Sequence, residues 1–197
     1  MDHIKYIHSY LEDSIQVKQK LLKREQVLAT VSKVANLIID TYGNGNGNKV
    51  LLAGNGGSAA DAQHIAAEFV SRFFFDRPGL PAMSLTTDTS MLTSIGNDYG
   101  YNKLFSRQLQ AQSRPGDIFI GISTSGNSEN IVNAIQTAKE SSVISVVLCG
   151  ENGKLKDLAD IAICVPSSCT PFIQECHICI GHMICAIVEK QIFSKEQ

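Results

Sequence analysis

The sequence predicts an α/β fold, a three-layer sandwich around a five-stranded parallel sheet. From Lys49 onward, short apolar runs alternate with longer segments of helical periodicity, which is the pattern of parallel strands covered by helices on both faces. Before Lys49, apolar residues recur at helical spacing and predict helices that precede the sheet. The length of 197 residues suits one domain over 1–197, with a helical hairpin at 1–42 and an α/β core at 49–197.

The N-terminal hairpin is predicted from two amphipathic segments. Residues 4–23 and 26–42 each place apolar side chains at nearly helical spacing. The Gly- and Asn-rich run at 43–48 then ends the second helix, because these residues tolerate left-handed backbone. These two N-terminal helices come in addition to the helices needed to cover a five-stranded sheet. We therefore expect them, and the apolar C-terminal helix, to pack against another subunit.

The core elements are predicted to alternate along the chain. Strands are expected at 49–53, 81–86, 117–122, 143–149 and 160–165. Helices are expected at 58–73, 88–96, 101–113, 127–140 and 172–193. The segment Gly96-Asn97-Asp98-Tyr99-Gly100 is expected to be a turn-rich connector between two of these helices.

Composition excludes several classes of function. Apolar residues make up 44% of the chain and charged residues 18%, which is typical of a globular protein. The net charge of −2 and the lack of a Lys/Arg stripe give no basis for nucleic-acid binding. No apolar run approaches the roughly 20 residues of a membrane span, and the N-terminus lacks a signal-peptide pattern. We therefore expect a cytoplasmic protein that binds neither nucleic acid nor membranes.

The six cysteines all lie in the last quarter of the chain, mostly within apolar runs. Cys176 and Cys179 have the spacing of a zinc or redox pair, but no second pair of matching spacing accompanies them. We interpret the cysteines as reduced, packed thiols, because free Cys commonly behaves as a small buried hydrophobe.

Two loops carry the strongest functional signal. Residues 51–58 (LLAGNGGS) and 120–128 (IGISTSGNS) each follow an apolar run and precede a helical one. Such a loop presents backbone N–H groups and hydroxyls at the positive end of a helix dipole, which suits a phosphate. The second loop has four hydroxyls, more than an ordinary N-cap needs: Ser123, Thr124, Ser125 and Ser128. Two such loops in one domain predict a phosphorylated ligand.

Dinucleotide binding is the main alternative for the first loop. Gly54, Gly56 and Ala59 formally match the glycine fingerprint that follows a strand. That fingerprint also needs an acid about 20 residues later at the end of the second strand, and Asp88 lies well beyond that distance. A pyrophosphate site has no use for the second hydroxyl-rich loop, so we favour a phosphate monoester.

Ionisable residues in the helix after the first loop predict chemistry. Asp61, His64 and Glu68 share one helix face, and His64 and Glu68 are one turn apart. Such a pair can share a metal or hold a proton-transfer pair. The alternative is a solvated helix face with a weak His–Glu pair. The apolar neighbours predict a buried helix, where ionisable groups need a reason, so we favour function.

The C-terminal helix contributes two further polar candidates. Gln174 and His182 would lie about 12 Å apart along an ideal helix, too far to share one ion easily. Pro171 supports a helix start beside Gln174, because proline favours the first helical position. His182 taken alone is more often a core residue than a ligand.

At these residues the sequence resembles the sugar isomerase (SIS) superfamily, and within it the phosphoheptose isomerases. The resemblance covers nearly the whole chain and rests on residues 53–64, Glu68, Arg72, Arg77-Pro78, 96–98, 121–128, 173–175 and His182. It implies a flavodoxin-like SIS fold. It also implies interconversion of D-sedoheptulose 7-phosphate and D-glycero-D-manno-heptose 7-phosphate through an enediol, the first step toward ADP-heptose and surface heptose of lipopolysaccharide or capsule.

The resemblance implies roles for individual residues. Glu68 would be the base and His182 the acid. The substrate would be bound by Asn55, Gly56, Gly57, Ser58, Glu68, Arg72, Asn97, Asp98, Ser123, Thr124, Ser125, Ser128 and Gln174. One zinc ion per subunit would be held by His64, Glu68, Gln174 and His182, in a homotetramer whose sites draw on neighbouring chains. A zinc-bound carboxylate is a poorer base, so either Glu68 leaves the metal during turnover or the ion has another role.

One departure and two alternatives accompany the resemblance. Relatives usually have arginine where this chain has Phe172, so a positive charge near the site entrance is lost. A non-enzymatic SIS protein of the replication-initiation type would lack counterparts of Glu68 and His182, whose presence favours an enzyme. The other alternative is an isomerase of a different ketose phosphate, such as a hexulose 6-phosphate.

Overall fold

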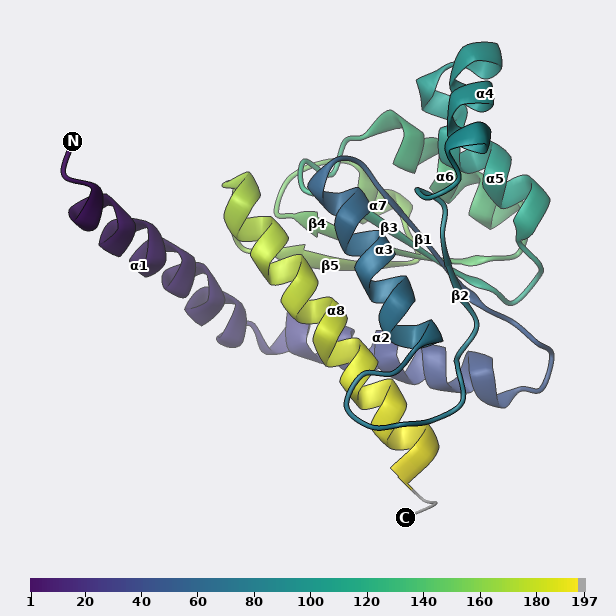
Figure 1. Ribbon diagram of the computed structural model, residues 1–197, viewed down its shortest axis with the longest axis horizontal. Helices are drawn as coiled ribbons and strands as arrows, with labels where there is room; N and C mark the ends of the chain where they lie inside the picture. Colours follow the sequence, from purple (N-terminus) through teal and green to yellow (C-terminus); the bar gives the residue numbers. More distant parts are fainter. Residues whose placement is uncertain (195–197) are drawn as a thin grey trace.

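The computed structural model describes residues 1–194, in which strands and helices alternate around one sheet (Figure 1). The elements are α1 (His3–Leu22), α2 (Glu25–Gly43), β1 (Val50–Gly54), α3 (Gly57–Val70), β2 (Ala82–Ser84), α4 (Thr89–Tyr99), the 3-10 turn η1 (Tyr101–Lys103), α5 (Leu104–Gln112), β3 (Ile118–Ser123), α6 (Glu129–Glu140), β4 (Ile144–Gly150), α7 (Leu155–Leu158), β5 (Ile161–Val165) and α8 (Thr170–Phe193). The five strands are parallel in the order β2-β1-β3-β4-β5. This is the flavodoxin-like order, and the predicted fold class is confirmed.

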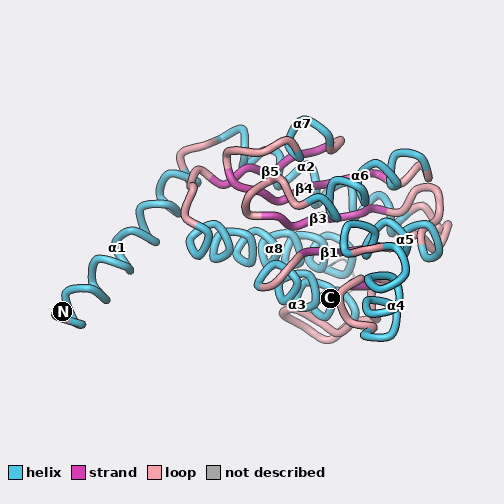
Figure 2. The backbone as a smooth tube through the Cα atoms, turned by 90° about the horizontal axis from the view of Figure 1, so that it is seen from above, coloured by secondary structure: helices cyan, strands magenta, loops and turns pink. Residues whose placement is uncertain are grey.

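Helices cover both faces of the sheet. One apolar core joins the sheet to α2, α3 and α8, and a second core joins its other face to α5, α6 and α7. Figure 2 shows the strands between α3 and α8 on one side and α6 and α7 on the other. Strands β1 and β3 are neighbours, and Gly54 pairs with Ile122. The loops that follow these strands therefore open at the same edge of the sheet.

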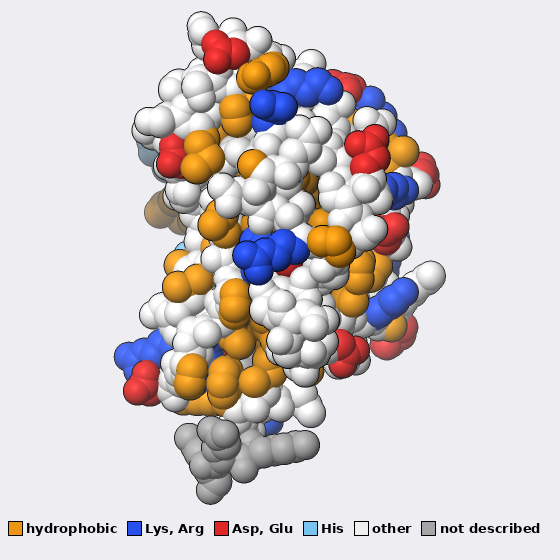
Figure 3. Space-filling view, turned by 90° about the vertical axis from the view of Figure 1, so that its right-hand side faces the viewer, with side chains coloured by type: hydrophobic (Ala, Val, Ile, Leu, Met, Phe, Trp, Pro, Cys, Tyr) orange, Lys and Arg blue, Asp and Glu red, His pale blue; other side chains and the backbone are white. Residues whose placement is uncertain are grey.

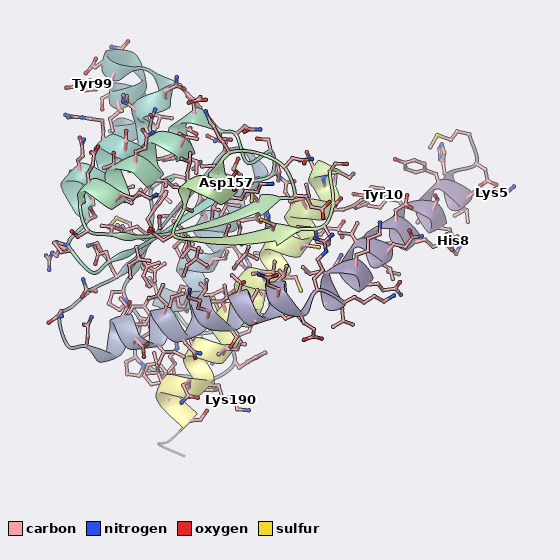
Figure 4. All side chains as sticks on the ribbon, turned by 180° about the vertical axis from the view of Figure 1, so that it is seen from behind. Lys5, His8, Tyr10, Tyr99, Asp157 and Lys190 are labelled. Atoms are coloured by element: carbon pink, nitrogen blue, oxygen red, sulfur yellow. The ribbon has the colours of Figure 1, made fainter. Side chains whose placement is uncertain are left out.

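Helix α1 projects from the body of the molecule (Figure 1). The Asp2 side chain caps it by accepting from the Ile4 and Lys5 N–H groups. Its contacts with α8 lie at the start of that helix, where the Lys18 ammonium donates to the Glu175 carboxylate at 2.6 Å. Figure 4 shows Tyr10 on the side of α1 toward this region.

Phe172 belongs to the same contact between α1 and α8. Its ring is almost fully buried and meets the Tyr10 ring edge-to-face, with centroids 4.9 Å apart. An arginine here would place a charge in this apolar contact. The departure from the usual arginine thus adds aromatic packing at the junction of the two helices.

The structure corrects several predicted boundaries. Gly96, Asn97 and Asp98 lie within α4, which continues to Tyr99 and ends where Gly100 takes φ +85°. The connector prediction was wrong. It followed from the low helix propensity of Gly, Asn and Asp, but α4, which the Asp88 carboxylate caps by accepting from the Met91 N–H, continues through all three residues. Helix α3 ends at Val70, three residues early, and β2 keeps only Ala82–Ser84. The four-residue α7 is too short to give a periodic signal.

Helix α8 is a longer apolar segment than the sequence analysis expected. Among residues 1–194 it is the one helix long and apolar enough to cross a membrane, with a mean hydropathy of 1.4 over its most apolar window. It is instead a packed core helix that buries His177 and Glu189 completely. It is therefore not a convincing membrane span.

On the face shown in Figure 3, Lys and Arg side chains are scattered among Asp and Glu and form no basic patch.

Candidate active site

The first loop joins β1 to α3 by a tight turn. Gly54 has no room for a side chain, because a Cβ there would overlap the Ser58 backbone. Gly56 takes φ +57°, a conformation that favours glycine. A Cβ on Gly57 would lie 2.5 Å from the Gln174 side-chain nitrogen, so the amide of Gln174 rests directly on this loop. The loop thus brings the start of α3 against the start of α8.

The second loop joins β3 to α6 and is not an ordinary helix cap. Ser128 occupies the N-cap position, but its side chain makes no capping hydrogen bond and pairs instead with the Ser123 hydroxyl at 3.0 Å. The loop is held from behind, since the Gly150 N–H donates to Thr124 O and the Leu155 N–H donates to Gly126 O. The hydroxyls and the start of α6 therefore form a cradle suited to an anion.

A polar network that the sequence analysis did not find ties the two loops together. The side-chain amides of Asn55 and Asn130 exchange two hydrogen bonds of 3.0 and 2.8 Å. The Tyr101 hydroxyl donates to Asn55 Oδ1 at 2.8 Å. Asn130 is buried on the first turn of α6. A polar residue at an otherwise apolar helical position was its only sequence signal.

Three side chains that could bind a metal ion meet between α3 and α8. The His64 Nε2 lies 3.2 Å from Glu68 Oε1 and 3.0 Å from His182 Nε2. One ligand atom of each residue lies within 4.8 Å of the others. The helices can approach because Gly181 has no side chain, and a Cβ there would lie 2.5 Å from Ile65 Cδ1. Two imidazoles and a carboxylate in this arrangement can hold a divalent ion or exchange protons.

A scan against protein families matches residues 9–150 to the SIS domain. The chain belongs to the SIS domain family. It is 61% identical to a phosphoheptose isomerase of Aneurinibacillus thermoaerophilus, over 95% of this chain and 94% of that protein. It is 58% identical to phosphoheptose isomerase 2 of Campylobacter jejuni, over 96% and 94% of the two chains. A solved phosphoheptose isomerase of Francisella tularensis superposes with a TM-score of 0.91 at 35% identity, covering 96% of this chain and all of the other.

Gln174, on α8, does not join the three clustered side chains. Its amide rests on Gly57, seven residues before His64 on α3, which corresponds to about 10 Å along the helix axis. Asp61 is also separate from the cluster. Burial raises its pKa to about 6, partly offset by His64, and its Oδ2 is buried without a hydrogen-bond partner among residues 1–194. The single chain therefore assembles three of the four expected metal ligands.

The remaining expected substrate residues lie on exposed surface. Arg72 follows the end of α3, and Asn97 and Asp98 hydrogen-bond to each other on α4. A cavity of about 260 Å³ separates α4 from the first loop. Its lining includes Asn55, Gly56, Thr86, Thr93, Gly96 and Tyr101. Gly96 brings α4 to the rim of this cavity, one residue before Asn97.

A buried charged clamp fixes the end of α3 to α8. The Arg77 guanidinium donates to the carbonyls of Glu68 and Phe69 at 2.8 Å each, and to Glu189 Oε1 at 3.0 Å. The Glu189 carboxylate also accepts from the Phe73 and Phe74 N–H groups at 2.7 Å each. Burial would raise the pKa of Glu189, but these donors together hold it below its usual range. Arg77 was noted in the sequence, but this role was not predicted.

Proposed function

We propose that this protein is a phosphoheptose isomerase that interconverts D-sedoheptulose 7-phosphate and D-glycero-D-manno-heptose 7-phosphate. The observation that carries the proposal is the meeting of Glu68 and His182 between α3 and α8, in a chain whose two Gly- and Ser-rich loops open at one edge of the sheet. Two relatives that match almost the full chain are named phosphoheptose isomerases. We propose that it acts in the cytoplasm and that it catalyses the first step of surface-heptose synthesis.

The two loops divide substrate binding in this proposal. The cradle of Ser123, Thr124, Ser125 and Ser128 binds the phosphate, because its hydroxyls and the start of α6 offer several donors to one anion. The sugar is bound by the first loop, through Asn55, Gly56, Gly57 and Ser58. Gln174 contacts it from α8, where its amide already lies against Gly57. Asn130 and Tyr101 orient Asn55 without touching the phosphate.

Glu68 and His182 perform the proton transfers. Exchange of an aldose and a ketose through an enediol moves a proton between C1 and C2, which needs a base, and it needs a donor at the carbonyl oxygen. Glu68 takes the carbon-bound proton, and His182 protonates the carbonyl oxygen. The Arg77 clamp fixes the Glu68 carbonyl and so holds the last turn of α3 in place.

A zinc ion fits the clustered ligands. His64, Glu68 and His182 would hold it, and their imidazole and carboxylate donors are those that zinc prefers. Gln174 would be the fourth ligand, supplied by a neighbouring chain, because within one chain it lies about 12 Å from His182 along α8. When bound, the ion would polarise the oxygen atoms of the substrate. One ion per subunit is proposed.

We also propose a homotetramer with sites at subunit interfaces. Helix α1 exposes a stripe of Ile4, Ile7, Leu11 and Ile15, each more than half accessible. Such a stripe at helical spacing on a projecting helix supports packing against another chain. In this assembly Arg72, Asn97 and Asp98 complete substrate sites that one chain leaves open.

The decisive experiment is turnover of D-sedoheptulose 7-phosphate by the purified protein, with zinc added or removed by a chelator. Appearance of the aldose product supports the proposal. Turnover of a hexulose 6-phosphate alone would favour the other isomerase. Absence of turnover of either sugar phosphate, with and without zinc, overturns the proposal and favours a non-enzymatic binding protein.

Glu68→Gln tests the assigned base. We expect turnover to be lost while binding of a phosphorylated sugar stays largely intact, because the phosphate cradle is on another loop. Glu140→Gln, at the exposed end of α6, is the matched control and keeps full activity. Joint loss of binding and turnover in Glu68→Gln would instead assign Glu68 a structural role.

A further inference from the structure

Two cysteines from adjacent strands lie together on the sheet face beneath α7. Cys149 on β4 and Cys164 on β5 are register partners, so their side chains point to the same face. Their Sγ atoms are 3.6 Å apart. Neighbouring strands lie about 5 Å apart, inside the range of about 4.4–6.8 Å that a disulfide spans between Cα atoms. The backbone therefore already has the spacing of a disulfide.

The two thiols differ in exposure and in acidity. Cys149 is completely buried, and Cys164 is half-buried on the edge strand β5. A hydrogen bond from the Cys149 thiol to the Cys164 sulfur lowers the pKa of Cys164, and Lys156 lowers it further. The same hydrogen bond, together with burial, raises the pKa of Cys149. Because a peroxide reaches the more accessible thiol first and the thiolate is the reactive form, Cys164 is the attacking thiol and the buried Cys149 the resolving one.

We propose that Cys149 and Cys164 form a site of reversible oxidation, at which a hydroperoxide converts the dithiol into a disulfide. The Cys164 thiolate attacks one peroxide oxygen, and the O–O bond breaks to give a sulfenic acid and, after protonation, water or an alcohol. The Cys149 sulfur then attacks the sulfenic sulfur, forming the S–S bond and breaking the S–O bond. The departing hydroxide takes the Cys149 proton as water. The dithiol loses two electrons, and the peroxide gains them.

The other cysteines do not offer this arrangement. Cys169 and Cys179 are exposed, and Cys176 and Cys185 are buried in α8. Over residues 1–194, no other two cysteine sulfurs are in hydrogen-bond contact. Cys149 and Cys164 are therefore the proposed oxidation site because they are register partners with adjacent sulfurs, and not because they are exposed. The Gly150 that follows Cys149 contacts Thr124 of the second loop, so the site lies next to the phosphate cradle.

Peroxide treatment of the folded protein, followed by alkylation in denaturant and trypsin digestion without reductant, tests the site. The tryptic segment 140–154 contains Cys149 as its single cysteine, which makes it a clean reporter. We expect its alkylated form to be lost after peroxide and to return with dithiothreitol. The count of free thiols should fall from six to four when Cys149 and Cys164 alone react.

Two variants assign the partner of Cys149. Cys164→Ser should keep segment 140–154 alkylated after peroxide, whereas Cys169→Ser, the matched control, should lose it as the wild type does. Fragmentation of the linked wild-type peptide identifies the partner even where a variant fails to fold. The proposal is overturned if segment 140–154 stays alkylated while Cys169 or Cys179 is oxidised, or if Cys149 is linked to any cysteine other than Cys164. The readout needs no substrate, so it is independent of the isomerase proposal.

Discussion

The two sides of the candidate site are built differently. On one side, α3 and α8 are held together by the buried Arg77–Glu189 pair and by close contact at Gly181. On the other side, α4 has no buried residue and presents Asn97 and Asp98 on its surface. The proposed proton-transfer groups thus sit on the packed side, and proposed sugar contacts sit on the exposed side. Reaction geometry needs groups that are held in place, and the packed side provides this for Glu68 and His182.

Breaking the clamp tests the packed side most severely. Arg77→Met leaves the Glu189 carboxylate buried without its cation, which should cost about 3–5 kcal/mol of the free energy of unfolding. Urea unfolding at fixed protein concentration measures it. The control is Lys154→Met, which removes the exposed pair with Glu129 and should cost less than about 1 kcal/mol. Similar losses in both variants would contradict the comparison.

Removing the proposed acid should disable chemistry without unfolding the protein. His182→Gln is expected to lower kcat by about 100-fold or more, the usual contribution of a positioned acid or base. Steady-state kinetics with D-sedoheptulose 7-phosphate measures the effect. His3→Gln, at the exposed start of α1, is the control. A His182→Gln enzyme with unchanged kcat would remove His182 from the mechanism.

Forcing α3 and α8 apart should have an intermediate effect. The added methyl of Gly181→Ala overlaps the buried Ile65 side chain, and overpacking of this kind costs about 1–3 kcal/mol. We expect a lower melting temperature and a lower kcat, because His64 and His182 separate. Gly43→Ala is the control, since nothing lies within 4 Å of its added Cβ. Wild-type stability and kcat in Gly181→Ala would show that the helices adjust freely.

The pH dependence of stability should also report on the clamp. The pKa of Glu189 is lower in the folded protein than its ordinary value of 4.5. Its stabilising contribution is therefore complete above the unfolded-state pKa and is lost as pH falls through the folded-state pKa. Glu189→Gln should make the loss of stability on acidification shallower, whereas Glu140→Gln keeps the wild-type slope. An unchanged slope in Glu189→Gln would exclude this titration.

The exposed side should give the smallest effect. Asn97→Ala is expected to raise KM by about 5- to 30-fold, the loss of one or two hydrogen bonds of about 1 kcal/mol each. Its free energy of unfolding should stay within about 0.5 kcal/mol of the wild type. A fall in kcat as large as that of His182→Gln would show that α4 takes part in the chemistry.

Local sequence signals predicted much of the architecture and part of the site. Alternating apolar runs and helical segments predicted the five parallel strands, because period and burial are written into neighbouring residues. The i, i+4 spacing of His64 and Glu68 predicted that they share a helix face, and the structure places them 3.2 Å apart. The division of the chain into hairpin and core stays a prediction, as do the roles assigned to individual site residues.

Local signals failed where neighbours in space decide the structure. Asn97 and Asp98 have low helix propensity, but α4 continues through both of them to Tyr99. Asn130 showed only a polar residue in an apolar helix, and its pairing with Asn55 across 75 residues left no periodic trace. Arg77 and Glu189 are 112 residues apart, and nothing in either segment indicates that they meet.

The sequence by itself determined the sheet, the positions of the two Gly- and Ser-rich loops and the His64–Glu68 pair, because each depends on residues within a turn or two of one another. Only the tertiary structure decided that His182, 118 residues from His64, completes the cluster. It also decided that Gln174 rests on Gly57 and that Cys149 meets Cys164. These contacts depend on how closely α3 approaches α8 and on which strands are neighbours. Both are set by packing of the whole core, which no local pattern encodes.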